Sequence, residues 1–520
     1  MAKHTVAKTG DLADGQMKQV TAGEHKLLLV RTGGEYRALG ASCPHHGAPL
    51  AEGLCHEGHI VCPWHAARFD ATDGSLLDPP ALDALPSFPV EIDGDDVVVD
   101  LPEEPPETAP AAMASRDDAA DDRTFVILGG GAAGLTAAET LRREGFRGRL
   151  LMVTREDDPP YDRTDLSKSY LSKRKPYPPG IRRKGSYESH GIELTTGFEV
   201  ATVDAAAGRL ADADGREIAF DRLLMATGGL PRTLDAPGAD LDGVVTLRGL
   251  ADAKDLRRRI AEAERAVVVG ASFIGMEVAA GLTQRGLKVT VVAPDAVPFA
   301  RTFGQAIGDM YRRVHEGKGV AFRLGAKVAA FEGDGKLDSV VLADGTAVPA
   351  ALAVLGVGVR PATGFLDEAE TNDDGSVTVD QHLRVAGDVF AAGDIARFPA
   401  PGTGGPMRIE HWRVAQQQGA VAAANMLDRG LAYRRAPFFW TNQYMVITDY
   451  AGRAVDPDDV VIEGDLDAHD FLAYYVKEGA VHAVAGCGRS RAVAAALEVL
   501  DVEPLPGLDD LRKTIADLAG

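Results

Sequence analysis

Short apolar runs separated by turn residues fill the first hundred positions of the chain. The runs at 26–30, 90–92 and 97–99 are aliphatic and are bounded by Gly, Pro and Asp. Alternating apolar and polar positions with frequent turn residues are typical of short antiparallel strands. We therefore expect residues 1–101 to form a small antiparallel β domain.

A different pattern begins at Arg123 and occurs twice. Residues 124–128 are continuously apolar, a glycine cluster follows, and apolar residues then recur at helical spacing. The same strand, glycine loop and helix pattern begins again at 266–269. A buried strand followed by a glycine loop and a helix is typical of nucleotide-binding α/β units. The repeat predicts two such domains, at 123–240 with 361–435 and at 241–360.

The remaining segments differ from both patterns. Residues 102–122 are rich in Pro, Ala, Asp and Glu and have no apolar periodicity, so we expect a flexible acidic linker that lets the first domain move. Residues 436–520 mix short strand-like runs with a helical tail, which predicts a C-terminal α+β domain. The fold class is therefore multidomain, with β, α/β and α+β parts.

Composition narrows the possible partners. A chain of 520 residues is too long for one compact core. Its formal net charge of −22 disfavours nucleic acid and anionic membranes as partners. No apolar run is long enough to span a bilayer, and the first ten residues lack a secretory pattern. We expect a cytoplasmic protein, monomeric or homodimeric.

The cysteines are few and widely spaced. They are Cys43, Cys55, Cys62 and Cys487, and no Cys-x-x-Cys or Cys-x4-Cys pair occurs. A redox-active dithiol needs such a pair, so a disulfide reductase is disfavoured. We interpret Cys55 as a lone thiol and Cys487 as structural.

Two of these cysteines belong to a candidate metal site. Cys43 and His45 form Cys-x-His, and after sixteen intervening residues Cys62 and His65 form Cys-x-x-His. Two loops that each give one thiolate and one imidazole can hold a Rieske [2Fe–2S] cluster. A zinc site is the alternative, although zinc fingers usually pair Cys with Cys and His with His. His46 is interpreted as a surface neighbour.

The first glycine loop has the Gly-x-Gly-x-x-Gly pattern. Its glycines allow a tight turn and a close approach of the backbone to a pyrophosphate at the helix N-terminus. After the next strand, Glu156 is the candidate for the ribose hydroxyls, with Asp157 and Asp158 as alternatives. The loop residues expected at the cofactor are Gly129, Gly131, Ala133 and Gly134.

The second loop predicts the nicotinamide site. Serine, which is also small, replaces the middle glycine, and the expected contacts are Gly270, Ser272, Ile274, Gly275 and Glu277. The acidic ribose position after the next strand holds Ala293, and Asp295 follows it. No arginine stands there for a 2′-phosphate. The cofactor is therefore NAD(P)H, with NADH favoured.

Two family resemblances follow from these motifs. Residues 43–50 and 62–65 resemble Rieske ferredoxins and the Rieske domains of oxygenases. In Rieske proteins of respiratory complexes a disulfide joins the two loops, and here Ala48 and Trp64 occupy those positions. The resemblance therefore implies the ferredoxin-like, lower-potential type.

Residues 123–520 resemble the apoptosis-inducing-factor and oxygenase-coupled branch of ferredoxin reductases, which bind FAD. The resemblance implies a catalytic Lys168–Glu277 pair beside flavin N5. Core packing is an alternative reading for Trp440. Further contacts that the resemblance implies are Arg163, Lys168, Ala226, Thr227, Gly228, Gly358, Gly393, Asp394, Glu410, His411, Trp412 and Trp440.

Together these features predict an electron-transfer enzyme. NAD(P)H would reduce FAD, which would pass single electrons to the cluster and on to an unidentified protein acceptor, such as an oxygenase, a cytochrome or another carrier. The alternative is a redox-responsive binding protein in which flavin reduction changes conformation or oligomeric state. A disulfide or peroxide reductase is a third possibility, against which the missing dithiol argues.

Overall fold

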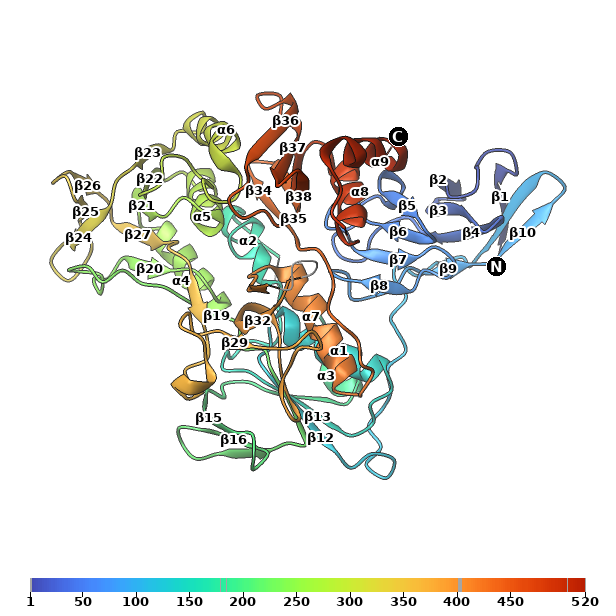
Figure 1. Cartoon of the computed structure of the whole chain (residues 1–520), viewed down its shortest axis with the longest axis horizontal. Helices are drawn as coiled ribbons and strands as arrows, with labels where there is room; N and C mark the ends of the chain where they lie inside the picture. Colours follow the sequence, from blue (N-terminus) through green and yellow to red (C-terminus); the bar gives the residue numbers. More distant parts are fainter. Residues whose placement is uncertain (1, 178, 184, 401–404, 503, 520) are drawn as a thin grey trace.

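The computed structural model describes residues 2–177, 179–183, 185–400, 405–502 and 504–519. Figure 1 shows the N-terminal β domain beside the C-terminal helices, with the second α/β domain at the opposite end of the view and the first α/β domain below them. Among the described residues, no helix combines the length and apolar character needed to cross a membrane.

The N-terminal β domain contains three antiparallel sheets. Their orders are β2-β3-β4-β9, β5-β6-β7-β8 and β1-β11-β10. The run at 27–30 is apolar throughout because β3 is buried on both faces: Leu28 and Val30 lie in one core, and Leu27 and Leu29 in another. The strands are β1 Ala2–Lys8, β2 Met17–Ala22, β3 His25–Thr32, β4 Glu35–Gly40, β5 Leu54–His56, β6 His59–Val61, β7 Arg68–Asp70, β8 Leu76–Asp78, β9 Ser87–Phe88, β10 Val90–Asp93 and β11 Asp96–Leu101.

Segment 102–122 follows the surface of the protein. Ala109 exchanges two backbone hydrogen bonds of 3.0 Å with Ala84 of the N-terminal domain. Ala114 donates to the carbonyl of Arg142 at 2.8 Å, and Arg116 pairs with Glu193, both in the first α/β domain. The segment expected to be a flexible linker is thus hydrogen-bonded to the domains on both sides of it.

The first α/β domain is built on the six-stranded sheet β14-β13-β12-β18-β31-β30. All pairs are parallel except β30 with β31. Helices α1 and α7 pack on each other beside this sheet. The main elements are β12 Thr124–Leu128, α1 Ala132–Arg143, β13 Arg149–Val153, β14 Ile192–Thr195, β18 Arg222–Met225, β30 Arg384–Ala386, β31 Val389–Ala391 and α7 Trp412–Asn425. The smaller ones are α2 Ser169–Ser172, α3 Ser186–Ser189, β15 Val200–Asp204, β16 Arg209–Asp212, β17 Glu217–Ala219, β19 Gly229–Pro231, β28 Val359–Pro361, β29 Val377–Thr378, β32 Ala396–Pro399 and β33 Pro406–Met407.

The second α/β domain repeats this plan on the parallel sheet β20-β27-β21-β22-β23. Its strands are continuously apolar because helices and a small meander cover the sheet. The elements are β20 Val244–Thr246, α4 Leu250–Ile260, β21 Arg265–Val269, α5 Phe273–Gln284, β22 Lys288–Ala293, α6 Gly304–Glu316, β23 Ala321–Leu324, β24 Val328–Glu332, β25 Ser339–Leu342, β26 Ala347–Pro349 and β27 Leu352–Leu355.

The C-terminal domain is the antiparallel sheet β34-β35-β38-β37-β36 with two helices. Leu54, Val61 and Ala66 of the N-terminal domain share one buried apolar cluster with this sheet and its helices. The elements are β34 Phe438–Gln443, β35 Val446–Gly452, β36 Asp459–Asp465, β37 Asp470–Lys477, β38 Ala480–Cys487, α8 Ser490–Leu500 and α9 Leu508–Ala519. The predicted fold class is confirmed, and the buried cluster joins two domains that are far apart in the sequence.

Candidate functional site

Two loops with the same hydrogen-bond pattern bring the predicted cluster ligands together. In the loop after β4, Gly47 donates to the Cys43 carbonyl and Cys43 donates to that of Ala48, at 2.8 and 2.9 Å. In the loop after β6, Ala66 donates to the Cys62 carbonyl and Cys62 to that of Ala67, at 3.2 and 2.8 Å. Each turn thus presents one cysteine and one histidine.

The four side chains contact each other in two pairs, histidine with histidine and cysteine with cysteine. His45 Nδ1 lies 3.0 Å from His65 Nδ1, and both thiols are buried. A hydrogen bond between the thiols, together with burial, raises the pKa of Cys43, and the same hydrogen bond lowers the pKa of Cys62. Two facing imidazole nitrogens beside two contacting thiols fit the donor set of a Rieske cluster.

Burial keeps both histidines in the form that binds metal. It lowers the pKa of His45 to about 3 and places that of His65 well below its usual value. A metal-binding imidazole must be neutral, so neither ring has to lose a proton when the cluster binds. The neighbouring His46 is exposed, and its Nε2 lies 3.5 Å from Asp162 Oδ2 of the first α/β domain. A hydrogen bond with Asp162 raises the pKa of His46.

Most of the predicted flavin and nicotinamide residues surround one cavity of about 760 Å³ between the two α/β domains. This volume is near the upper end of the range for cofactor pockets. The cavity extends from the loop after β12 to β34 of the C-terminal domain. The predicted residues that line it are Gly129, Gly131, Ala133, Glu156, Arg163, Lys168, Ala226, Thr227, Gly228, Ser272, Ile274, Glu277, Gly358, Gly393, Asp394, Glu410, His411, Trp412 and Trp440.

The other predicted glycines, Gly134, Gly270 and Gly275, do not line this cavity. A Cβ on Gly134 would lie 1.9 Å from the Gly129 carbonyl, and one on Gly275 would lie 2.2 Å from the Gly270 carbonyl. These positions let each helix pack closely on its strand, which is the role of the third glycine in such loops. Around Gly131 the space for a Cβ is open. The middle of the first loop therefore leaves room for a phosphate group to approach the backbone.

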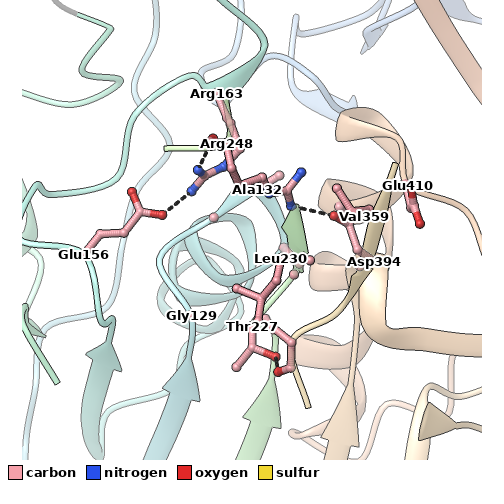
Figure 2. A pocket seen from close by; sticks show the side chains of 18 of the residues that line it. Gly129, Ala132, Glu156, Arg163, Thr227, Leu230, Arg248, Val359, Asp394 and Glu410 are labelled. Atoms are coloured by element: carbon pink, nitrogen blue, oxygen red, sulfur yellow. Dashed lines mark hydrogen bonds and ion pairs between the residues drawn. The ribbon is translucent and has the colours of Figure 1, made fainter. Parts of the chain in front are cut away.

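Polar side chains form a chain of contacts along one wall of the cavity (Figure 2). Arg163 donates to Glu156 at 2.6 Å and to the Arg248 carbonyl at 2.7 Å, and Arg248 donates to Asp394 at 2.7 Å. Burial opposes ionisation of Glu156, but Arg163 and the Tyr161 hydroxyl outweigh it and leave its pKa below the usual value. Arg248 was not predicted, because it precedes α4 in a segment without a motif.

Lys168 and Glu277 form an ion pair at the other wall. Lys168 Nζ lies 3.0 Å from Glu277 Oε2, and the Glu277 side chain is 3% exposed. Ser167 and Thr441 also donate to Glu277, at 2.5 and 2.8 Å. The pair that the resemblance implied is therefore present, and β34 supplies one of its partners.

Aromatic side chains connect the cavity with the cluster loops. The Trp440 ring lies 3.9 Å from that of His65 between centroids, and Trp440 also lines the cavity. His411 is half-buried, its pKa is lowered to about 4 by burial of the ring, and its buried Nδ1 has no partner among the described residues. An unpaired buried polar atom at a cavity is the expected mark of a site that binds a polar ligand. The glycine loop, this atom and the cavity size fit FAD.

Family models match almost the whole chain. The pyridine nucleotide-disulphide oxidoreductase model covers residues 123–419, the Rieske [2Fe–2S] domain model covers 2–89, and the reductase C-terminal model covers 438–519. These ranges agree with the domains that the structure separates.

Curated relatives and solved structures point to the same group. Apoptosis-inducing factor 3 of Mus musculus is 39% identical over 95% of this chain and 83% of its own length. The ferredoxin reductase component of chlorobenzene dioxygenase from Cupriavidus sp. (strain PS12) is 34% identical over 75% of this chain and 96% of its own. The crystal structure of the ferredoxin reductase for the CYP199A2 system from Rhodopseudomonas palustris matches with a TM-score of 0.72, at 30% identity over 76% of this chain and all of that one.

The site and the relatives give the same assignment. The chain is an FAD-dependent NAD(P)H oxidoreductase with a Rieske [2Fe–2S] cluster. It belongs to the pyridine nucleotide-disulphide oxidoreductase family, in the group of Rieske-bearing, apoptosis-inducing-factor-like proteins and ferredoxin reductases.

Proposed function

We propose that this protein transfers electrons from NADH to its own cluster, and from there to a separate one-electron acceptor protein. When bound, FAD and the cluster together let the two electrons of one hydride leave in two single-electron transfers. One proton is released. Two acceptor molecules are thus reduced for each NADH oxidised. The observation that carries the proposal is the position of Trp440, which touches both the cavity and His65.

The protein's own side chains bind and orient. Lys168, held by Glu277 at 3.0 Å, would fix the reactive edge of the flavin. Arg248 and Asp394, paired at 2.7 Å, would bind hydroxyl groups of its ribityl chain. No residue need act as a general base, because the transferred hydride carries its own electron pair.

NADH is proposed over NADPH from the second loop. Asp295 lies two positions after Ala293, which occupies the usual acidic ribose position at the end of β22, and a carboxylate near the adenine ribose would repel a 2′-phosphate. Steady-state oxidation of both nucleotides tests this choice. A higher kcat/KM for NADPH than for NADH would contradict it.

The acceptor is proposed from the relatives. The chlorobenzene dioxygenase component is named as a ferredoxin reductase, so an oxygenase system is the acceptor class to test first. Anaerobic titration with NADH, followed by electron paramagnetic resonance, tests the internal transfer. The expected result is bleaching of the flavin together with a reduced Rieske signal. Bleaching without that signal contradicts the proposal.

A redox-responsive binding protein is the second candidate, favoured by the 39% identity to an apoptosis-inducing factor over most of both chains. It predicts a change in hydrodynamic size when NADH is added. Size-exclusion chromatography with and without NADH separates the two functions.

A further inference from the structure

Helix α7 connects the flavin cavity with the cluster loop. The residues just before and at its start, His411 and Trp412, line the cavity, and the next residue, Arg413, points into the N-terminal domain. The Arg413 side chain is 1% exposed. Its guanidinium donates to the carbonyl of Ala66 at 3.0 Å, to the carbonyl of Pro79 at 2.9 Å, and to the Asp78 carboxylate.

Ala66 is the residue that follows the cluster ligand His65. It has a left-handed backbone, with φ of 56°, and its amide closes the turn of the Cys62 loop. A non-glycine residue in this conformation needs support from its surroundings. Arg413 therefore holds the ligand loop itself, at the point where its backbone is strained.

Helix α7 also holds the buried carboxylate of Asp78, the acidic partner of Arg413. Gln417, one helical turn after Arg413, donates to both oxygens of Asp78 at 3.1 and 2.9 Å. Arg413 and Gln417 lie on the same face of the helix because residues four apart are neighbours. Arg413 and Asp78 are 335 positions apart in the sequence, so their contact joins two domains.

A second buried charged contact holds the same domain from another direction. Arg68 donates to Glu498 at 2.9 Å and to Asp501 at 2.7 Å, both in or beside α8, and its side chain is 5% exposed. The N-terminal domain also contributes Leu54, Val61 and Ala66 to the apolar cluster that it shares with the C-terminal domain. An interface with an apolar core and paired buried charges resembles the interior of a single domain.

We propose that Arg413 is a positioning residue that keeps the cluster loop docked against the flavin cavity, with Asp78 and Gln417 as its partners. The N-terminal domain then stays docked during turnover and does not swing on segment 102–122. This inference rests on the proposed internal electron transfer for its kinetic consequence. Its structural consequence, a permanently docked domain, can be measured independently.

The test uses the full-length protein loaded with FAD and cluster. The variant is Arg413→Met combined with Asp78→Asn, which removes both charges and leaves none unpaired. The matched control is Arg142→Met, since Arg142 is equally buried but donates only to carbonyls of its own domain, those of Phe146, Gly148 and Gly191. Small-angle X-ray scattering measures docking, and stopped-flow absorbance separates flavin reduction from cluster reduction.

The expected result is a larger radius of gyration and an unchanged rate of flavin reduction by NADH. Cluster reduction should slow by on the order of 10- to 100-fold, because small misplacements of reacting groups reduce reaction rates by about this factor. The control variant, Arg142→Met, should change neither the radius of gyration nor the rate of cluster reduction relative to that of flavin reduction. Arg413→Lys keeps the positive charge but loses the forked set of donors, so it should slow cluster reduction by an intermediate amount. This variant replaces the double variant in the test if the double variant does not fold.

Two outcomes overturn the inference. One is a double variant that remains as compact as the wild type and reduces its cluster at the same rate. The other is an Arg142→Met control that expands and slows equally, which would show general destabilisation. If the wild type never reduces its cluster, the proposed function fails, and scattering alone then decides whether Arg413 docks the domain.

Discussion

The indole of Trp440 lies on the imidazole of His65, with ring centroids 3.9 Å apart and the planes inclined by 33°. The next residue along β34, Thr441, donates a hydrogen bond of 2.8 Å to Glu277. One strand of the C-terminal domain therefore contacts both a predicted cluster ligand, His65, and the ion pair at the cavity. This arrangement places the cluster loop beside the cavity through a single aromatic side chain.

Replacing Trp440 should separate the two redox steps. We expect Trp440→Leu to slow electron transfer to the cluster by roughly tenfold or more, because it removes the ring that contacts His65. Flavin reduction by NADH should slow much less than cluster reduction, although Trp440 also lines the flavin cavity. Stopped-flow absorbance measures both steps, and Trp440→Phe, which keeps an aromatic ring, is the control. Equal rates of cluster reduction in Trp440→Leu and the wild type would show that the contact between Trp440 and His65 is only structural.

Removing the Lys168 ammonium should affect the earlier step. Lys168→Ala should slow flavin reduction by about 100-fold, the usual effect of losing one preorganised charged donor. The cluster should remain intact. Lys173→Ala, an exposed lysine five positions later, is the matched control. If stopped-flow experiments show the same rate of flavin reduction in Lys168→Ala and the wild type, Lys168 has no catalytic role.

Two adjacent histidines should differ completely in their effect on the cluster. His45→Ala should abolish the Rieske resonance, since His45 Nδ1 faces His65 Nδ1 at 3.0 Å. His46→Ala should retain it, because that ring points to Asp162 instead. Electron paramagnetic resonance and iron and sulfide analysis check this prediction. Bound zinc without sulfide in the wild type would favour the alternative metal.

The buried carboxyl of Asp449 should make stability depend on pH. Burial raises its pKa from 3.8 to about 7, although Ser490 donates to it at 2.7 Å. The folded state then binds a proton more tightly than the unfolded state, so the contribution of Asp449 to stability is greatest below about pH 4 and is lost as the pH rises to about 7. At about 1.4 kcal/mol per pKa unit, the loss is on the order of 4 kcal/mol.

Asp449→Asn removes this titration. Its free energy of unfolding, relative to the wild type, should increase between pH 4 and 7 and then level off. Urea unfolding at several pH values measures the difference. A difference between the two proteins that does not vary with pH would show that Asp449 is ionised in the folded state.

Local motifs in the sequence predicted the parts of the site that consecutive residues build. Cys43 and His45, like Cys62 and His65, share one turn, so their spacing already implies that they act together. The glycine loops at 129–134 and 270–275 were predicted for the same reason, because a strand, a turn and a helix start lie within a few residues. Charge and apolar pattern gave the domain classes.

Tertiary structure decided how these parts are joined. The Arg413–Asp78 contact, the Arg248–Asp394 pair and the hydrogen bond from Thr441 to Glu277 each join residues more than a hundred positions apart. The pattern of apolar and polar residues does not predict such contacts, because they depend on how complete domains pack together. The sequence therefore determined which cofactors the chain can hold, and the packing of α7 and β34 decided that the cluster lies beside the flavin cavity.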